Sequence, residues 1–494
     1  MSIFVANKKL GVSAALLVTA LALLWTGAIP SGGSEAGLDA VIVGGRVMDP
    51  ESGLDAVRNV GIRGGKIVAI TAEPLTAKET IDAKGLVVAP GFIDLHQHGQ
   101  DAENYDVKAA DGVTTALEME VGVADIDAWY GAREGKARIN FGATIGHIPA
   151  RIAVMHDPPT LLPSGDAAHR AATPAEIEQM KAILDKGLQR GALGVGLGPA
   201  YTFAATNWEI LEMFRVAAKH RASCHVHIRA LPSDKEGDIS GFQEVMADAA
   251  ISGAPLHIVH LQSTGGPNVL HELQMIEEAQ KRGIDVTTEC YPYSRGMTDI
   301  SSAIFDHKES EPDSYFASLL WPATGEMLTR DTFLKYRKTG GMVILPSNTE
   351  ENVRAAVISP LTMIASDGRL ENGKGHPRTA GTYAKVLGQY VRQDHAMDLM
   401  TALRKMTIMP AKRLETRAPV FQNKGRIKPG ADADIVVFDP LTVADHSTYT
   451  KPNELSSGFA FVLVNGVTVV RSSKLVDNIF PGRGARAPIE TNSN

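Results

Sequence analysis

The chain has 494 residues, and 49 Lys and Arg against 56 Asp and Glu give it a net charge of −7. Hydrophobic residues at 44% and charged residues at 21% are typical of a folded globular protein and exclude disordered and fibrous classes. The acidic balance and the lack of a long basic run argue against nucleic acid as a partner, and two cysteines are too few for a disulfide framework or a zinc finger. The 15 histidines are the unusual feature, so their positions are the best guide to function.

Residues 1–36 have the pattern of an export signal and are not expected to belong to the fold. Lys8 and Lys9 precede a long apolar run, and small residues follow it. This order is typical of a secretory signal, with cleavage after Ala28 or after Ala36. The apolar run is also about long enough to span a bilayer, so an uncleaved membrane anchor is the alternative. We therefore expect an exported protein that is periplasmic or secreted, or that is held at the membrane by this segment.

Runs rich in β-forming residues occur at both ends of the remaining chain. Val60–Ile70 contains a Gly-Gly turn signal, while Phe459–Val464 and Val467–Arg471 flank an Asn-Gly hairpin turn. Because both ends combine short β-rich runs with turn signals, we expect one small composite β-sandwich domain built from residues 37–87 and 418–485.

Between these ends, over residues 88–417, strand-like and helix-like runs alternate. Alternation with eight strands predicts an α/β fold, a TIM-like (β/α)8 barrel. The stretch 294–360 is too long for a simple connection and is expected to be an insertion over the barrel mouth. The predicted strands are Val87–His96, Val113–Glu120, Ile139–His147, Leu193–Ala200, Ala222–Arg229, Leu256–Gln262, Ile284–Tyr293 and Leu361–Asp367. Amphipathic helices are predicted at Thr173–Arg190, Asn207–His220, Gly241–Ser252 and Val269–Arg282.

Imidazoles and carboxylates gather at the carboxyl ends of the predicted strands, where barrels of this type have their active sites. His96 and His98 end the first strand and, being two residues apart, share a face. Burying so many ionisable groups around one axis is costly unless something binds them, so the set predicts a divalent-metal site, with zinc the best-suited ion. The other members are Glu118 and Glu120 in the second strand, His225 and His227 in the fifth, His260 in the sixth and Asp367 in the eighth.

The segment around the first two histidines resembles the first-strand motif of the amidohydrolase superfamily, since residues 88–98 read VAPGFIDLHQH. Residues 363–368 read MIASDG and residues 376–378 read HPR, and this pair makes the chain similar to the N-acyl-D-amino-acid deacylases, the D-aminoacylase family. The resemblance extends over about residues 38–485. It implies a metal-dependent hydrolase with one or two zinc ions, held by His96, His98, His227, His260 and Asp367.

The sequence departs from these deacylases in two places that bear on the site. Where the family has a metal-binding cysteine after the second strand, an ungapped match places Val121, which cannot bind metal. The adjacent Glu120 is therefore expected to bridge two ions, with Glu118 as the alternative. Gln262 stands where the family usually has a lysine, which leaves open how a substrate carboxylate is held.

The resemblance further implies that the protein hydrolyses the amide bond of small N-acyl amino acids, of the D series, to a carboxylate and a free amino acid. Asp367 is expected to act as general base on the attacking water and then as general acid on the leaving nitrogen. Substrate contacts are expected from residues near the barrel mouth, namely His147, Tyr291, Tyr293, Arg295 and Arg378.

Two other functions remain compatible with the sequence. The first is another hydrolase of the superfamily, acting on a cyclic amide, a lactone or a dipeptide. The second is an inactive exported binding protein on a barrel scaffold, against which the complete ligand set argues. The acyl group, the amino-acid side chain, the strength of any D preference and the oligomeric state do not follow from the sequence.

Overall fold

The computed structural model describes residues 37–229 and 236–490. The predicted export signal, residues 1–36, lies outside the described residues. Among the helices of the described part, none is long and apolar enough to cross a membrane.

Eight parallel strands form a nearly closed barrel, which confirms the predicted fold class. Hydrogen bonds beyond the strands join the first to the last: the Asp367 N–H donates to the His96 carbonyl at 2.7 Å, and the His98 N–H to the Gly368 carbonyl at 3.0 Å. These bonds bring His96, His98 and Asp367 to the same place. The barrel strands are β6 (Phe92–Asp94), β7 (Val113–Val123), β8 (Asn140–Gly146), β9 (Gly194–Leu197), β10 (Ser223–Val226), β11 (Leu256–Ile258), β12 (Val286–Cys290) and β17 (Thr362–Ile364).

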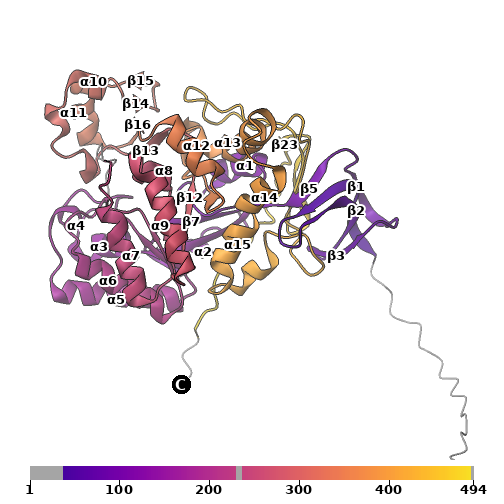
Figure 1. The fold of residues 1–494 in the computed structure, drawn as a ribbon, viewed down its shortest axis with the longest axis horizontal. Coiled ribbons are helices and arrows are strands. Elements are labelled where there is room, and N and C mark those ends of the chain that lie inside the picture. The colour runs from indigo at the N-terminus through magenta and orange to yellow at the C-terminus, as the bar shows by residue number, and fades with distance from the viewer. Residues whose placement is uncertain (1–36, 230–235, 491–494) are drawn as a thin grey trace, which may run out of the picture. The chain divides into compact units, whose positions relative to one another are not determined.

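Helices cover the outside of the barrel, and α5, α6 and α7 pack side by side (Figure 1). The start of α5 is a capping box: the Thr173 side chain accepts from the Glu176 N–H, and the Glu176 carboxylate accepts from the Thr173 N–H. Four helices confirm the amphipathic pattern, namely α5 (Pro174–Gln189), α6 (Asn207–Lys219), α7 (Ser240–Ser252) and α9 (Val269–Lys281). The others around the barrel are α1 (Ala102–Ala110), α2 (Ile126–Gly131), α3 (His147–Met155), α4 (Asp166–His169), α8 (Leu261–Thr264), α12 (Glu350–Ile358), α13 (Arg378–Lys385), α14 (Leu399–Met406) and α15 (Ile408–Glu415).

Strands from both ends of the described chain form one continuous nine-stranded sheet with its own apolar core. The segment predicted as one strand, Val87–His96, divides here, because its first part joins this sheet and its second part begins the barrel. Gly91 separates the two parts, and a Cβ there would lie 2.2 Å from Thr114 Oγ1, so no larger residue fits. The strands are β1 (Leu38–Asp49), β2 (Leu54–Arg63), β3 (Lys66–Thr71), β4 (Ala77–Asp82), β5 (Val87–Pro90), β20 (Ile435–Phe438), β21 (Phe459–Val464), β22 (Val467–Arg471) and β23 (Lys474–Leu475).

The stretch 294–360 contains an inserted subdomain with a four-stranded antiparallel sheet. Phe305, Phe316 and Phe333 belong to its own apolar core. In Figure 1 its helices lie at the opposite end of the view from β1–β3. The insertion is shorter than predicted, because α12 returns to the barrel and packs on α9 and β17. Its elements are β13 (Arg295–Asp299), α10 (Asp313–Phe316), β14 (Leu320–Trp321), β15 (Glu326–Met327), α11 (Arg330–Thr339) and β16 (Met342–Pro346).

Candidate metal centre

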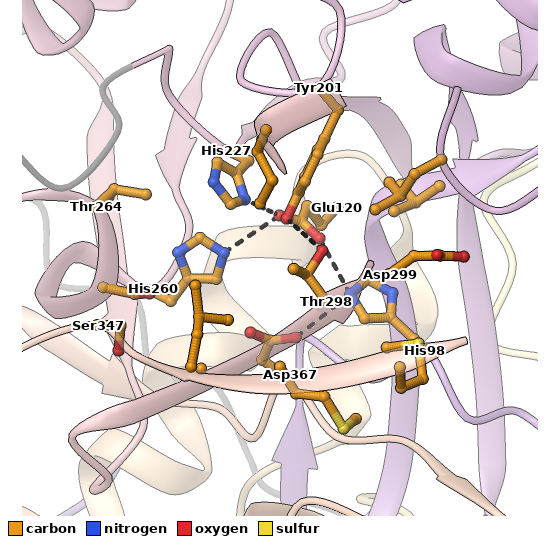
Figure 2. Close-up of a pocket in the computed structure, with 18 of the residues that line it drawn as sticks. His98, Glu120, Tyr201, His227, His260, Thr264, Thr298, Asp299, Ser347 and Asp367 are labelled. Atoms are coloured by element: carbon orange, nitrogen blue, oxygen red, sulfur yellow. Dashed lines mark hydrogen bonds and ion pairs between the residues drawn. The ribbon is translucent and has the colours of Figure 1, made fainter. Parts of the chain in front are cut away.

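Side chains from five barrel strands or their ends converge at one point near the carboxyl ends of the strands (Figure 2). Two of the residues, His260 and Asp367, have left-handed backbone angles, with φ of 31° and 51°. Such angles are uncommon outside glycine and are concentrated at functional sites. Ligand atoms lie within 4.8 Å of one another in each of three groups: His96, His98 and Glu120; His96, His260 and Asp367; and Glu120, His227 and His260.

The Glu120 carboxylate lies between two pairs of imidazoles. Its Oε2 is 3.0 Å from Nε2 of His98 and 3.2 Å from Nε2 of His96. Its Oε1 is 2.6 Å from Nδ1 of His227 and 3.2 Å from Nε2 of His260. Burial favours the neutral acid, but the charge of His96 and the hydrogen bonds from His227 and His260 outweigh it and hold the pKa of Glu120 well below its ordinary value. An ionised carboxylate with one oxygen toward each imidazole pair is suited to contact two cations.

Asp367 joins the same cluster from the last barrel strand. Its Oδ1 is 3.4 Å from Nε2 of His98 and 3.6 Å from Nε2 of His96. Its Oδ2 is 2.9 Å from Nη2 of Arg378. Burial opposes ionisation, yet the charges of Arg378 and His96 keep the pKa of Asp367 far below its ordinary value. The side chain is therefore ionised at neutral pH.

Carboxylates behind two of the imidazoles fix the orientation of the rings. Nδ1 of His96 lies 2.7 Å from Glu289, and Nδ1 of His98 lies 2.8 Å from Glu118. The second oxygen of Glu118 accepts from the N–H groups of Val121 and Gly122 at 3.2 and 3.3 Å. Carboxylate–histidine pairs of this kind are typical of metal sites, where they hold the free ring nitrogen toward the ion. The geometry thus gives the two carboxylates of β7 different surroundings, with Glu120 in the cluster and Glu118 behind His98.

His225, the other histidine of the fifth strand, lies outside this cluster. Its Nε2 is 3.0 Å from Ser223 Oγ, and its ring packs 4.8 Å from that of His257. Burial lowers its pKa well below the ordinary value, so it is a neutral core histidine.

A pocket opens over the cluster and is lined by both the barrel and the insertion. Figure 2 shows Thr264 and Ser347 on the side of His260, and Asp299 on the side of His98. The aliphatic part of the lining consists of Val121, Leu161, Leu162, Met297, Ile304, Met342 and Leu345.

Tyr201 is a site residue that the sequence did not indicate. It follows β9, lines the pocket and packs its ring edge-on to His227 at 4.8 Å, with its hydroxyl toward Glu120 (Figure 2). Burial and then the charge of Glu120 raise its pKa well above the ordinary value, so the phenol keeps its proton. Thr298 Oγ1 donates to it at 3.4 Å, which leaves the phenol proton available to a ligand.

Of the five residues predicted to contact substrate, one lines the pocket and a second, Arg378, is buried in contact with that residue. Tyr291 lines the pocket, and the Arg378 guanidinium lies over the Tyr291 ring at 4.5 Å. Besides Asp367, Nη2 of Arg378 reaches the Met297 carbonyl at 3.3 Å. The Nε and Nη1 groups of Arg378 are buried without a hydrogen-bond partner among the described residues.

The other three, His147, Tyr293 and Arg295, are also absent from the lining of this pocket. Tyr293 packs against Lys385, whose Nζ lies 4.0 Å from its ring centroid. Arg295 donates to the Ser318 carbonyl at 3.0 Å. His147 is fully buried at the first turn of α3, and its Nε2 lies 2.9 Å from a carboxylate of α6, described below.

That carboxylate is Glu209, which pairs with both His147 and Arg151 in the interior. All three side chains are fully buried. His147 Nδ1 and Glu209 Oε2 have no hydrogen-bond partner among the described residues, and none of the three side chains lines the pocket.

Comparison with known proteins gives a consistent set of relatives. The model of the amidohydrolase family matches residues 87–469. The chain is 31% identical over 482 residues to N-acyl-D-glutamate deacylase of Alcaligenes xylosoxydans xylosoxydans, covering 87% of this chain and 93% of that protein. A crystal structure of N-acyl-D-glutamate deacylase from Bordetella bronchiseptica, complexed with zinc and a phosphonate mimic of the tetrahedral intermediate, has a TM-score of 0.78 at 28% identity over 91% of this chain and all of that chain. A D-aminoacylase structure from work on its binuclear metal centre also has a TM-score of 0.78, at 26% identity and the same coverage.

Proposed function

The chain belongs to the amidohydrolase family, and on this basis we propose that it is a zinc-dependent hydrolase that cleaves N-acyl D-amino acids to a carboxylic acid and a free amino acid. The observation that carries the proposal is the Glu120 carboxylate between two imidazole pairs, with Asp367 beside them. The relatives named for N-acyl-D-glutamate deacylation and D-aminoacylation support the same reaction.

The donor set suits one or two zinc ions. Imidazole nitrogens and carboxylate oxygens are the donors that zinc prefers when no thiolate is present. His96, His98 and Asp367 would hold one ion, His227 and His260 the other, and Glu120 would contact both. When bound, zinc lowers the pKa of a water molecule toward about 7 and polarises a carbonyl oxygen.

Asp367 is the proton carrier in the proposed reaction. As water attacks the amide carbon, the Asp367 carboxylate takes a proton from the water, and a new C–O bond forms. It then delivers that proton to the nitrogen as the C–N bond breaks, so the amine leaves in neutral form. The pairing of Oδ2 with Arg378 leaves Oδ1 toward the cluster for both transfers.

Two further side chains would hold the substrate. The Tyr201 phenol is placed to donate to the carbonyl oxygen as that oxygen gains negative charge. The unpartnered Nε and Nη1 groups of Arg378 favour a substrate with a carboxylate, because buried donors without partners are costly and a guanidinium binds carboxylates well.

A substrate panel with the zinc-loaded enzyme tests the proposal. N-acetyl-D-amino acids should be hydrolysed with higher kcat/KM than N-acetyl-L-amino acids, cyclic imides, lactones or dipeptides. The matched control is Asp367→Asn, which should retain zinc and lose activity by about 1,000-fold or more. A preference for one of the other substrate classes, or substantial turnover by Asp367→Asn, would contradict the proposal.

Export of the enzyme is part of the same proposal and is supported by the basic and apolar order of residues 1–36. N-terminal sequencing of the protein from fractionated cells should find a start after Ala28 or Ala36. An intact N-terminus in the membrane fraction would instead identify an anchor.

A further inference from the structure

We propose that the enzyme prefers N-acyl amino acids with an uncharged, apolar side chain and discriminates against those that carry a second carboxylate, such as N-acyl glutamate and aspartate. This inference rests on the proposed function and narrows its substrate class. The inferred preference differs from that of two relatives, which are named as N-acyl-D-glutamate deacylases.

The first observation is an apolar wall that remains partly uncovered. Leu161 comes from the connection after α3, while Ile304, Met342 and Leu345 come from the insertion. All four line the pocket, and all four are partly exposed. An apolar side chain that enters the pocket would remove this surface from water, whereas a carboxylate would lose its hydration without gaining a partner there.

The second observation is the sign of the charge on the pocket wall. Beyond the ligand cluster, the described pocket lining contains one charged side chain, and it is the carboxylate of Asp299. Its Oδ1 accepts hydrogen bonds from the Ser301 N–H at 2.8 Å and the Ser301 hydroxyl at 2.7 Å. A second carboxylate on the substrate would therefore meet a charge of its own sign in a region of low dielectric constant.

The third observation is that the arginine beside the reaction centre has room for one carboxylate. Arg378 already pairs with Asp367, and the donors that remain on it are Nε and Nη1. Both parallel donor pairs of a guanidinium include Nη2, which is already engaged, so Nε and Nη1 can donate separately to the α-carboxylate of the substrate but offer no two-donor fork to a second carboxylate. Gln262 is uncharged, and its Nε2 donates to the Tyr291 carbonyl at 3.1 Å, so it adds no cation for another.

Three substrates of matched design test the inference on the zinc-loaded full-length enzyme: N-acetyl-D-leucine, N-acetyl-D-glutamine and N-acetyl-D-glutamate. Glutamine has the size of glutamate without its charge, so the pair isolates the charge. We expect kcat/KM for glutamate to fall about 10-fold or more below glutamine and about 100-fold below leucine. A glutamate value equal to or above the other two would overturn the inference and leave the proposed function intact.

If the enzyme hydrolyses none of the three substrates, that result counts against the proposed function. Binding measurements then still test the inference about the side chain. Calorimetry with the Asp367→Asn variant should show tighter binding of N-acetyl-D-leucine than of N-acetyl-D-glutamate. The reverse order would overturn the inference.

Substitutions in the wall provide an independent test. Leu345→Arg places a cation in the apolar wall and should raise the glutamate-to-leucine ratio of kcat/KM about 10-fold or more, whereas the matched control Leu345→Met should change this ratio by less than about 3-fold. Asp299→Asn removes the like charge without changing the size of the side chain and should raise the glutamate-to-glutamine ratio. Unchanged ratios in both Leu345→Arg and Asp299→Asn would overturn the inference.

Discussion

Nη2 of Arg378 lies 2.9 Å from Oδ2 of Asp367, and both side chains are buried. Both charged groups of a buried ion pair lose their hydration, and this cost offsets much of their attraction. The pair therefore contributes more to the orientation of the two side chains than to the stability of the fold. It fixes one oxygen of the general base and leaves the other toward the histidines.

Replacing this arginine is therefore expected to impair both binding and proton transfer. Arg378→Met should lower kcat/KM for an N-acetyl-D-amino acid by about 1,000-fold, because it removes the partner of Asp367 and the donors for the substrate carboxylate. Arg378→Lys should recover only part of the loss, since an ammonium group lacks the planar fork. Steady-state kinetics measure both variants, and Arg295→Met is the control outside the pocket. A kcat/KM for Arg378→Met within 3-fold of wild type would rule out this role.

The two carboxylates of β7 should differ in what their loss does to the metal. Glu120→Gln should remove at least one equivalent of zinc and most activity, because this carboxylate faces both imidazole pairs. Glu118→Gln should retain most of the metal and lose about 10- to 100-fold in affinity or activity, because it acts by orienting His98. Metal analysis by mass spectrometry with parallel kinetics distinguishes them, and full metal and full rate in Glu120→Gln would refute the bridging role.

The buried cluster of Glu209 with His147 and Arg151 should be measurable as stability. Arg151→Met leaves the Glu209 carboxylate in the interior without its guanidinium partner and should lower the free energy of unfolding by about 3–5 kcal/mol. Urea denaturation measures this change, while KM should remain close to wild type. A large rise in KM without loss of stability would instead support the substrate contact expected from the sequence for His147, the other partner of Glu209.

An ion pair outside the pocket lining has a strength that depends on pH. Nε2 of His169 lies 2.5 Å from Oδ2 of Asp306, which links α4 to the insertion. The hydrogen bond to Asp306 raises the pKa of His169 above its ordinary value of about 6.5. The stabilising contribution is therefore complete below about pH 6.5 and is lost as the pH rises through the raised value.

We expect KM for an apolar substrate to increase over that upper pH range as the link weakens. His169→Gln should remove this pH-dependent component and give a KM that is flatter with pH. Asp306→Asn is the less specific variant, since Asp306 also pairs with Arg337. KM profiles that coincide for wild type and His169→Gln would show that the link does not affect the pocket.

The sequence predicted those parts of the site that depend on strand parity and local motifs. His96 and His98 share a face because they are two residues apart, and Asp367 lies in a recognisable motif. The distinction between Glu118 and Glu120 could not be read in this way, because both have the same parity and the register of β7 shifts after Glu118. Only the three-dimensional path of the strand gives them different partners.

Other features depend on contacts between segments that are far apart in the chain. Tyr201 follows β9 without any motif, and its place at the cluster is seen only in its contact with His227, which follows another strand. His147 has the position of a strand-end residue, but it begins α3 and its imidazole pairs with Glu209 of α6. Periodicity describes one segment at a time, so it could not predict either outcome.

The hydrogen bonds that close the barrel also bring the metal ligands of its first and last strands together. Ser366 Oγ donates to Asp94 Oδ2 at 2.5 Å across a sequence separation of 272 residues, and the neighbouring Asp367 N–H reaches the His96 carbonyl. The first and last strands must therefore meet before the ligands form one site. An ion that binds only the closed barrel stabilises that form by mass action. Bound zinc would therefore stabilise the contact between the first and last strands in addition to its role in catalysis. Chelation should accordingly loosen the joint between β6 and β17 first, which hydrogen exchange at these two strands would reveal.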